Sequence, residues 1–279
     1  MVGLVRTHAA ADAIVASGGV PVISPTLDVS ALAPLLTGAS AVVHLAQVGA
    51  ERPGATYEGV NVGGTRAVVA AAGTAGVPRM VLFSGLGVAR YGQSKRCTNP
   101  YFLSKMAAEL ELLRSDLEAT IFRPSYIVGP GDAFVPELAR EISAGSVELP
   151  GDGSYRMQPI AAQDAADAIL SAVDRTTAGP RVFDLVGPEP VTCREFVGRL
   201  GMTLRRAERP ADYALRSLPV EEADRQAAGE GYRGMLSDEL DCMLCDEVAD
   251  HRPLEALLGR FLTPLDESLA IAVRALPRD

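Results

Sequence analysis

The chain has 279 residues, of which 48% are hydrophobic and 22% charged, and its formal net charge is -9. This length and composition predict a globular protein with a sizeable core, exclude a mainly disordered chain, and disfavour nonspecific nucleic-acid binding. No apolar run approaches the ~20 residues that cross a bilayer, and residues 1–6 lack the basic start and long apolar stretch of a signal peptide. We therefore expect a cytoplasmic protein with no nucleic-acid or membrane partner.

Short apolar runs alternate with segments of helical periodicity through the first two thirds of the chain. Strands are predicted at residues 2–5, 20–24, 41–46, 80–83, 119–122 and 182–185. Helices are predicted at residues 9–17, 31–36, 57–75, 100–114 and 161–173. Short apolar strands without alternation, separated by helices, indicate a parallel sheet that is covered on both faces. The pattern therefore predicts an α/β, Rossmann-like doubly wound fold.

The chain changes character at Gly187, after which it is helical, charged and interrupted by prolines. We expect residues 1–186 to form the Rossmann-like domain. Residues 187–279 are expected to form a smaller, mainly helical C-terminal region that covers the substrate.

The four cysteines are scattered, which is typical of a reducing compartment and not of a disulfide scaffold. Cys242 and Cys245 form a Cys-x-x-Cys pair, but no second pair of ligands is spaced for zinc. Residues 237–248 have the pattern of a helix, in which these two positions share one face. Two packed helical cysteines are the preferred interpretation, and we expect no metal site.

Tyr101 and Lys105 lie four residues apart at the start of the helix predicted at 100–114, and so share one of its faces. A free tyrosine, with a pKa near ~10, is too weak an acid to serve as a base at neutral pH, but a nearby lysine cation lowers that pKa. The pair is a candidate for proton transfer in carbonyl–alcohol chemistry. Taken alone, it also fits a surface tyrosine and lysine on a helix.

Further motifs surround this pair in a fixed order. They are Val42–Ala46, Asn61–Thr65, Val81–Ser84, Ile121–Pro130, Gly151–Gly153 and Gln163–Ile169. In order and spacing, residues 2–190 resemble the extended short-chain dehydrogenase/reductase family. The end of the chain resembles atypical members, which are similar to the NAD(P)H-binding accessory subunit of respiratory complex I.

The resemblance implies a catalytic group near the middle of the chain. Tyr101 would be the acid/base, and Lys105 would lower its pKa and bind the nicotinamide ribose. The family places a Ser or Thr that polarises the substrate oxygen where this chain has Leu86. Ser84 is the candidate hydroxyl, although it lies two residues earlier, about 6–7 Å away if the chain is extended. Losing one such donor typically lowers the rate by ~10²–10³.

The resemblance also implies an NADP or NAD cofactor and residues that bind it. Arg6 would read the adenosine ribose and would favour NADP, because an arginine suits a 2′-phosphate; a plain surface arginine is the alternative. Asp28 would bind adenine, or would only cap a helix. Ala46 would lie by the pyrophosphate, and Pro124 and Ser125 would border the nicotinamide. For Asn61, next to these motifs, the structural role of anchoring a helix is preferred.

One element of the family pattern is missing at the start. No Gly-x-x-Gly-x-x-Gly lies between the first strand and the first helix, although such a loop cradles the pyrophosphate. The strand before Arg6 corresponds to the family's second strand, so about 25–30 residues are expected to be lacking. The lost strand is central in the 3-2-1-4-5 order, so the sheet must re-close, carry a gap or borrow a strand. A misplaced start or a truncated form is preferred over genuine loss of cofactor binding.

Three functions remain open at this point. The first is an NAD(P)-dependent oxidoreductase that acts on a small carbonyl or alcohol, and the second is a non-catalytic dinucleotide-binding scaffold or sensor. The third is a sugar-nucleotide epimerase or dehydratase. Such enzymes carry an Arg-Asp-Tyr/Phe run, but in that register this chain has Met157, Gln158 and Pro159, and its arginine, Arg156, lies one position too early. This difference disfavours the third function, because an arginine that binds a diphosphate must lie at a fixed position. Each has a small-molecule substrate or ligand. By analogy with relatives, the helix of Tyr101 could pair with its copy in a homodimer.

Overall fold

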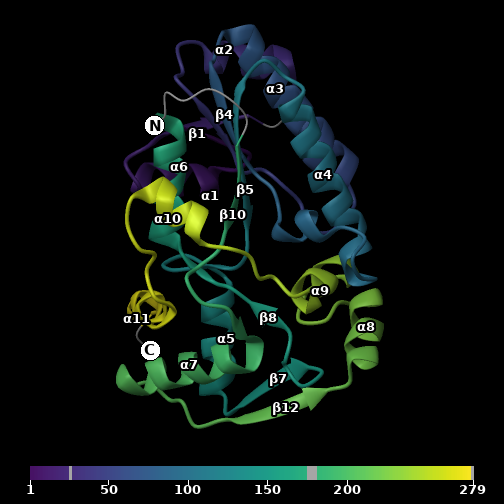
Figure 1. The fold of residues 1–279 in the computed structure, drawn as a ribbon, viewed down its shortest axis with the longest axis vertical. Helices are drawn as coiled ribbons and strands as arrows, with labels where there is room; N and C mark the ends of the chain where they lie inside the picture. Colours follow the sequence, from purple (N-terminus) through teal and green to yellow (C-terminus); the bar gives the residue numbers. More distant parts are fainter. Residues whose placement is uncertain (25–26, 175–180, 278–279) are drawn as a thin grey trace.

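The fold is built around a four-stranded parallel sheet with helices on both faces (Figure 1). The computed structural model describes residues 1–24, 27–174 and 181–277. The strand order is β10-β5-β4-β3, with β3 (Val42–His44), β4 (Arg79–Phe83), β5 (Glu118–Pro124) and β10 (Arg181–Leu185). One face is covered by α3 (Gly63–Ala75) and α4 (Pro100–Leu113), and the other by α6 (Ala162–Asp174) and α10 (Arg252–Leu258). The predicted doubly wound α/β architecture is confirmed.

The side chains of the central strands alternate between two hydrophobic clusters. Met80 and Leu82 of β4 and Ile121 of β5 pack with residues of α3 and α4. Val81 and Phe122 point the other way and pack with residues of α6 and α10. All five are at most 1% exposed. Because successive side chains of a strand point to opposite faces, a strand buried on both faces has a continuous apolar sequence.

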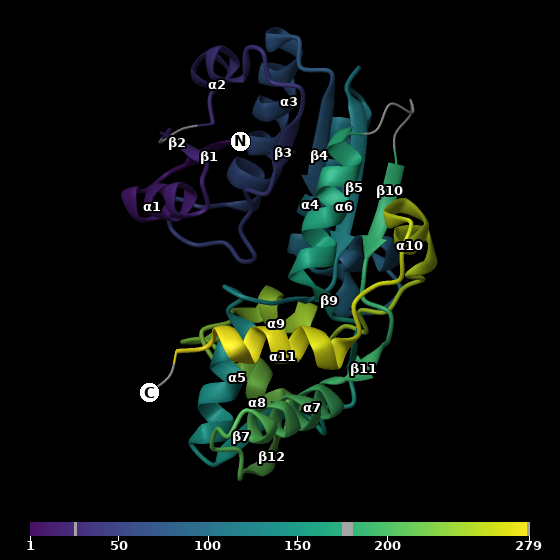
Figure 2. The same ribbon diagram turned by 90° about the vertical axis from the view of Figure 1, so that its left-hand side faces the viewer.

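The first two strands form a separate sheet. β1 (Val2–Val5) pairs in parallel with β2 (Val20–Ile23), and α1 (His8–Ala16) connects them. Within the described residues, β3 is the edge strand of the main sheet and pairs only with β4, while β1 pairs only with β2. Figure 2 shows the β1–β2 pair to one side of β3. Of the three expected arrangements, namely a re-closed sheet, a gap or a borrowed strand, the described residues have the gap, because β1 and β3 do not pair with each other.

The predicted helix at 57–75 is two helices of different geometry. Residues Tyr57–Val62 form the π-helix η1, and α3 continues from Gly63. The hydroxyl of Thr56 caps η1 by accepting a hydrogen bond from the N–H of Gly59 at 3.0 Å. Asn61 lies in this π-helix and is hydrogen-bonded to Val48 in the loop after β3, and π-helical turns are frequent at functional sites.

A second hydrophobic core lies below the sheet in Figure 1, and we call the elements around it the lower part. Its helices are α5 (Phe134–Ser143), α7 (Cys193–Arg206), α8 (Val220–Ala228), α9 (Ser237–Leu244) and α11 (Leu265–Ala275). Its strands are β7 (Ser146–Pro150), β8 (Arg156–Met157), β11 (Val191–Thr192) and β12 (Ala214–Leu218). The core thus includes residues before position 187, and the boundary at 186/187 stays a prediction.

The remaining elements are short. They are α2 (Val29–Leu36), the 3-10 helices η2 (Leu86–Arg90) and η3 (Arg96–Thr98), and the paired strands β6 (Ile127–Val128) and β9 (Ile160–Ala161). Helix α2 packs on α3. In the described residues, no helix has both the length and the apolar character needed to cross a membrane.

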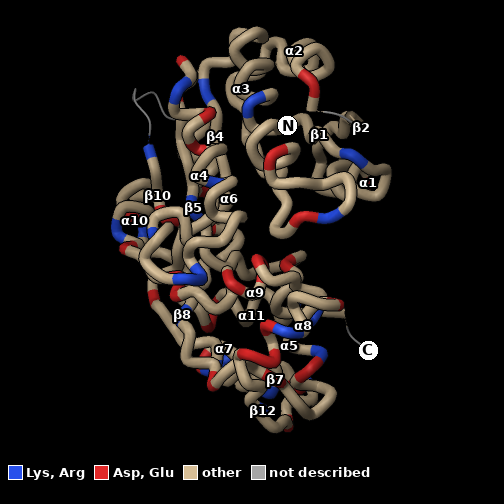
Figure 3. Tube along the Cα trace, turned by 90° about the vertical axis from the view of Figure 1, so that its right-hand side faces the viewer, with Lys and Arg blue, Asp and Glu red and all other residues tan. Residues whose placement is uncertain are grey.

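Charged residues of both signs are interspersed along the chain, including around α8 and α9 (Figure 3). Arg96, in η3 just before α4, forms a two-pronged ion pair with Asp224 of α8, both N···O distances being 3.0 Å. The same guanidinium contacts Asp241 of α9. Arg96 therefore fastens the start of the Tyr101 helix to the lower part.

Candidate functional site

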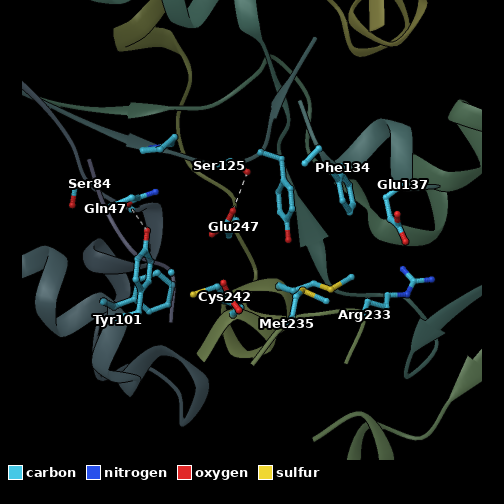
Figure 4. Close-up of a pocket in the computed structure, with 18 of the residues that line it drawn as sticks. Gln47, Ser84, Tyr101, Ser125, Phe134, Glu137, Arg233, Met235, Cys242 and Glu247 are labelled. Carbon is cyan, nitrogen blue, oxygen red and sulfur yellow. Dashed lines mark hydrogen bonds between the residues drawn. The ribbon is translucent and has the colours of Figure 1, made fainter. Parts of the chain in front are cut away.

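A pocket of about 520 Å³ opens between the carboxyl edge of the main sheet and the lower part. Figure 4 shows its arrangement, with Ser84 and Tyr101 at one end and Glu137 and Arg233 at the other. The lining is mainly apolar, and α5, α9 and the loop before α9 supply the end of the pocket away from Tyr101. A concave, mainly apolar pocket with a few converging polar groups is the usual form of a small-molecule site.

Tyr101 lies in the first turn of α4 and reaches the pocket. The helix starts there because the Asn99 side chain accepts a hydrogen bond from the N–H of Phe102 at 3.0 Å and Pro100 occupies the first helical position. The Asn99 amide also donates to the carbonyl of Asp238 at 3.1 Å, which joins the helix to α9. The phenol donates to Oε1 of Gln47 at 3.1 Å.

The environment of Tyr101 keeps its phenol protonated. Burial raises the pKa of Tyr101 above its ordinary value of 10, and the nearby Cys242 and Glu247 raise it further. The hydrogen bond with Gln47 acts in the opposite direction but is the smallest of these effects. A protonated phenol at neutral pH is a proton donor, as the reduction of a carbonyl requires.

Lys105 is buried one turn further along α4. Its side chain is 2% exposed, and Nζ donates a hydrogen bond to the carbonyl of Phe83 at 2.6 Å. Burial lowers the pKa of Lys105 to about 8, and the nearby Glu109 only partly opposes this. Glu109 is itself engaged in a two-pronged ion pair with Arg123, at 2.8 and 2.6 Å. The lowering of the Tyr101 pKa by Lys105 stays a prediction.

Two buried polar atoms at the carboxyl edge of the sheet lack hydrogen-bond partners within the described residues. They are Oγ of Ser84, which follows β4, and Nε2 of His44, which ends β3. Burial and the nearby Lys105 lower the pKa of His44 to about 4, so its ring is neutral. A buried polar group without a partner destabilises a fold by about 1–3 kcal/mol, and such groups typically meet a ligand or water.

The segment after β4 lies directly against the tyrosine ring. A Cβ added to Gly85 would lie 3.6 Å from the phenol oxygen of Tyr101, so this glycine backbone is in contact with the site. Ser84 lines the pocket beside it. Leu86 is only 2% exposed and turns into η2. Ser84 is therefore the hydroxyl of this segment that reaches the pocket.

The structure brings some of the predicted site residues together and leaves others apart. Ser84, Tyr101, Pro124 and Ser125 all line the pocket, and Lys105 is buried behind it.

The residues predicted for the adenosine side do not line this pocket. Arg6 is exposed after β1, and Ala46 is exposed after β3. Asp28 is exposed at the N-cap position of α2, where its side chain makes no capping hydrogen bond. The cofactor roles of these three residues stay predictions.

The sequence did not point to Gln47 or Glu247, although both face Tyr101. Gln47 directly follows the strand predicted at 41–46, and ligands of parallel sheets bind at the carboxyl ends of strands, so the sequence does carry a signal for Gln47. Glu247 falls in the helix predicted at 237–248, and there the prediction was wrong. Helix α9 ends at Leu244, because Cys245 takes the extended conformation (φ -75°, ψ 142°).

The Cys-x-x-Cys pair packs with a third cysteine: Cys245 and Cys97 are buried, and the half-buried Cys242 lies against them. All four cysteines are free, and Sγ of Cys245 lies 3.2 Å from Sγ of Cys97, in an apolar cluster that includes Phe102. Burial raises the pKa of Cys242 and of Cys245, which keeps both thiols protonated and unreactive. In the part of the chain that the structure describes, no group of three or more His, Cys, Asp or Glu side chains could hold a metal ion.

Asn61 is the structural anchor of the loop that carries Gln47. Its side chain accepts from the N–H of Val48 at 2.8 Å and donates to the Val48 carbonyl at 3.1 Å and to Oγ of Ser104 at 2.9 Å. We expect Asn61→Ala to lower the free energy of unfolding by about 2–4 kcal/mol, because it leaves buried groups unpaired. Urea denaturation measures this loss. The exposed Thr74→Ala in α3 is the control; an equal loss in both variants would contradict the anchoring role.

A doubly wound sheet with a Tyr-x-x-x-Lys helix at its carboxyl edge defines a dinucleotide-binding type of α/β protein. Comparison with known proteins agrees with this. The chain belongs to the NAD dependent epimerase/dehydratase family, whose pattern matches residues 10–185. The predicted resemblance to extended short-chain dehydrogenases/reductases is thus confirmed.

Individual relatives share about 30% sequence identity with this chain, over part of its length. The chain is 30% identical to a 2-alkyl-3-oxoalkanoate reductase of Stenotrophomonas maltophilia, over 62% of this chain and 59% of that protein. It is 29% identical to mitochondrial NADH dehydrogenase [ubiquinone] 1 alpha subcomplex subunit 9 of Arabidopsis thaliana, over 43% of this chain and 29% of that protein. The chain thus spans about three fifths of the reductase's length.

The fold also matches solved structures. A dTDP-glucose 4,6-dehydratase from Streptomyces venezuelae, determined with NAD bound, superposes with a TM-score of 0.72. The two sequences are 22% identical, and the match covers 98% of this chain and 86% of that chain. This likeness supports the fold assignment.

Proposed function

We propose that this chain is an NAD(P)-dependent reductase of a carbonyl compound that carries an apolar chain. The observation that carries the proposal is the pocket itself. It holds a protonated tyrosine, Tyr101, beside the hydroxyl of Ser84, which has no hydrogen-bond partner among the described residues. The pocket continues into an apolar space lined by Phe134 and Met235. The reductase among the relatives supports the same reaction class.

The residues at the carboxyl edge fit the nicotinamide end of the cofactor. Oγ of Ser84 and Nε2 of His44 are buried without partners in the described part of the chain, and a polar ligand would supply them. The buried ammonium of Lys105 lies nearby and has donor capacity beyond its bond to the Phe83 carbonyl. Pro124 and Ser125 form the adjoining wall. A bound nicotinamide would supply the hydride for reduction.

The protein's own groups would then handle the substrate oxygen. Ser84 would donate a hydrogen bond to the carbonyl oxygen, and Tyr101 would donate the proton that converts the developing alkoxide into an alcohol. Gln47 would hold the phenol in place through the hydrogen bond seen in the structure. The apolar lining would exclude water and accommodate the rest of the substrate.

The preference for NADP over NAD rests on Arg6, exposed at the end of β1. A guanidinium there suits a 2′-phosphate. We infer NADP as the preferred cofactor and NAD as the alternative.

Two neighbouring residues argue against a sugar-nucleotide substrate. Nε and Nη2 of Arg156 both donate to Oδ2 of Asp246, at 2.9 and 2.8 Å, so this edge of the guanidinium is already engaged and would have to leave Asp246 to bind a diphosphate. Gln158 is 1% exposed and donates to the carbonyl of Gly187 at 2.7 Å. Both side chains are engaged in intramolecular hydrogen bonds instead.

A non-catalytic role is the second candidate. It is supported by the similarity to a subunit of NADH dehydrogenase and by Leu86 at the family's hydroxyl position. Both candidates bind a dinucleotide, but only the reductase turns over a substrate.

The direct test is oxidation of NADPH and of NADH, followed by absorbance, with a panel of ketones of increasing chain length. We expect turnover that improves with chain length and is faster with NADPH. Calorimetric titration with each dinucleotide accompanies the assay. Binding without turnover of any ketone would favour the non-catalytic candidate, and absence of binding would contradict both.

A further inference from the structure

Glu247 projects into the middle of the pocket from the segment between α9 and α10 (Figure 4). Its Oε2 accepts a hydrogen bond from Oγ of Ser125 at 3.2 Å. Among the described residues it forms no ion pair, because the guanidinium of Arg90, which acts on it electrostatically, is bound to backbone carbonyls. A carboxyl held this way faces a mostly apolar space with capacity for another hydrogen bond.

The backbone around Glu247 is fastened on several sides, and we call residues 245–249 the strap. Arg90 donates to the carbonyls of the residues before and after Glu247. The N–H of Glu247 donates to the carbonyl of Arg156 at 2.8 Å, and the N–H of Ala249 donates to Oε1 of Gln158 at 2.9 Å. The carboxyl is therefore positioned by fixed neighbours, as functional groups typically are.

The pocket has an order along its length. Tyr101 lies at one end, Glu247 and Ser125 lie in the middle, and Phe134 and Met235 lie beyond them (Figure 4). A substrate whose carbonyl lies at Tyr101 and whose chain runs toward Phe134 would pass Glu247. Its remaining chain would extend among the apolar side chains.

We propose that Glu247 determines specificity, by donating a hydrogen bond from its carboxyl to a second oxygen of the substrate near the reacting carbonyl. The substrates selected in this way are 3-oxo acids and 3-oxo esters with an apolar chain. The identity of the reacting carbonyl rests on the proposed reductase function. The hydrogen bond itself is a binding contact that can be measured without turnover.

The protonation of Glu247 agrees with this role. Burial raises the pKa of Glu247 to about 8, so the carboxyl carries a proton at neutral pH. The titratable groups that face it are Arg90, Tyr101, Tyr126, Cys242 and Cys245. Burial raises the pKa of both phenols and both thiols, which leaves the arginine as the charged neighbour.

The test compares two ligands that share a pentyl chain and a ketone, methyl 3-oxooctanoate and 3-octanone. We expect the wild type at pH 7 to bind the ester roughly tenfold more tightly in calorimetric titration, a typical difference for one buried hydrogen bond. Glu247→Ala should remove the preference, and Glu247→Gln should keep it because the amide also donates. Above about pH 8 the wild type should lose the preference while Glu247→Gln does not.

Thermal unfolding gives a readout that needs no ligand. Between about pH 4.5 and 8 the unfolded chain releases the Glu247 proton and the folded chain keeps it, so stability falls as the pH rises. The Tm of Glu247→Gln should therefore increasingly exceed that of the wild type over this range. The exposed Glu267→Gln in α11 is the control and should show no such trend.

Equal affinity of the wild type for both compounds, or an unchanged preference in Glu247→Ala, would overturn the inference. A preference that depends on Glu247 without turnover of either compound would support it and would refute the reductase function. The two failures are therefore distinguishable.

Discussion

Tyr101→Phe is expected to lower kcat/KM for ketone reduction by about 10²–10⁴ while leaving dinucleotide affinity within about twofold. The substitution removes one oxygen and the hydrogen bond to Gln47, and it keeps the ring that packs against Gly85. The proposed proton donor is lost, whereas Pro124 and Ser125, which line the pocket and are proposed to border the cofactor, are unchanged. NADPH oxidation and calorimetric titration on the same preparation measure the two quantities.

Tyr213→Phe is the matched control for this variant. Tyr213 lies in the lower part outside the pocket, and its hydroxyl donates to the carbonyl of Val197 at 3.2 Å. Loss of this hydrogen bond should lower the free energy of unfolding slightly and leave kcat/KM unchanged. Equal turnover in the wild type and in Tyr101→Phe would remove Tyr101 from the proposed mechanism.

The sequence predicted the main sheet well because burial on both faces produces a distinct pattern. Continuous apolar strands such as the one predicted at 80–83, which is β4 in the structure, can be recognised without knowing their partners. Strand β3 is shorter than predicted, since the apolar run Ala41–Ala46 continues into exposed residues after His44. Pattern alone does not show where hydrogen-bonded pairing stops.

The lower part was predicted less completely. The sequence pattern predicts no helix or strand for residues 126–157, although they form β6, α5, β7 and β8. Their pairing is non-local: β7 pairs in parallel with β12, whose residues are far away in sequence. Such partners leave little local signal, because a strand's stability depends on the neighbours it packs against.

The candidate site was predicted from one helix and completed by tertiary contacts. Tyr101, Lys105 and Ser84 could be identified from motifs close to one another in the sequence. The strap around Glu247 could not, since its conformation depends on Arg90 and on residues about ninety positions earlier. Extended segments held by side chains from other elements have no periodicity of their own.

The departure at Gln158 acquires a physical explanation from the structure. From the sequence alone, Gln158 in place of the family's motif residue only weakens the assignment to a sugar-nucleotide enzyme. In the fold its amide joins the backbone of Gly187 to the strap, through bonds of 2.7 and 2.9 Å. The same residue that lacks the charge for a diphosphate therefore helps to place Glu247 in the pocket.

Gly187→Ala is expected to cause the largest loss of stability among these variants, because the backbone of Pro159 and Ile160 packs directly against this glycine. An added Cβ would lie 1.9 Å from the carbonyl oxygen of Pro159 and 3.4 Å from Cα of Ile160, and both are backbone atoms that cannot rotate away. The N–H of Gly187 also donates to the carbonyl of Gln158 at 3.1 Å. Relieving the overlap would separate the two backbone segments and break this hydrogen bond, so we expect the free energy of unfolding to fall by about 3 kcal/mol or more.

Urea denaturation and the Tm measure this loss, which corresponds to a decrease in Tm of roughly 6–12 °C for a chain of this size. Gly198→Ala is the matched control, because a Cβ there meets no atom within 4 Å and the residue lies inside α7. That variant should gain up to about 1 kcal/mol from helix propensity. Gly187→Ala should also weaken binding of methyl 3-oxooctanoate, because it displaces the residue that fastens the strap. A Gly187→Ala protein with wild-type stability would show that this backbone contact has room for a side chain.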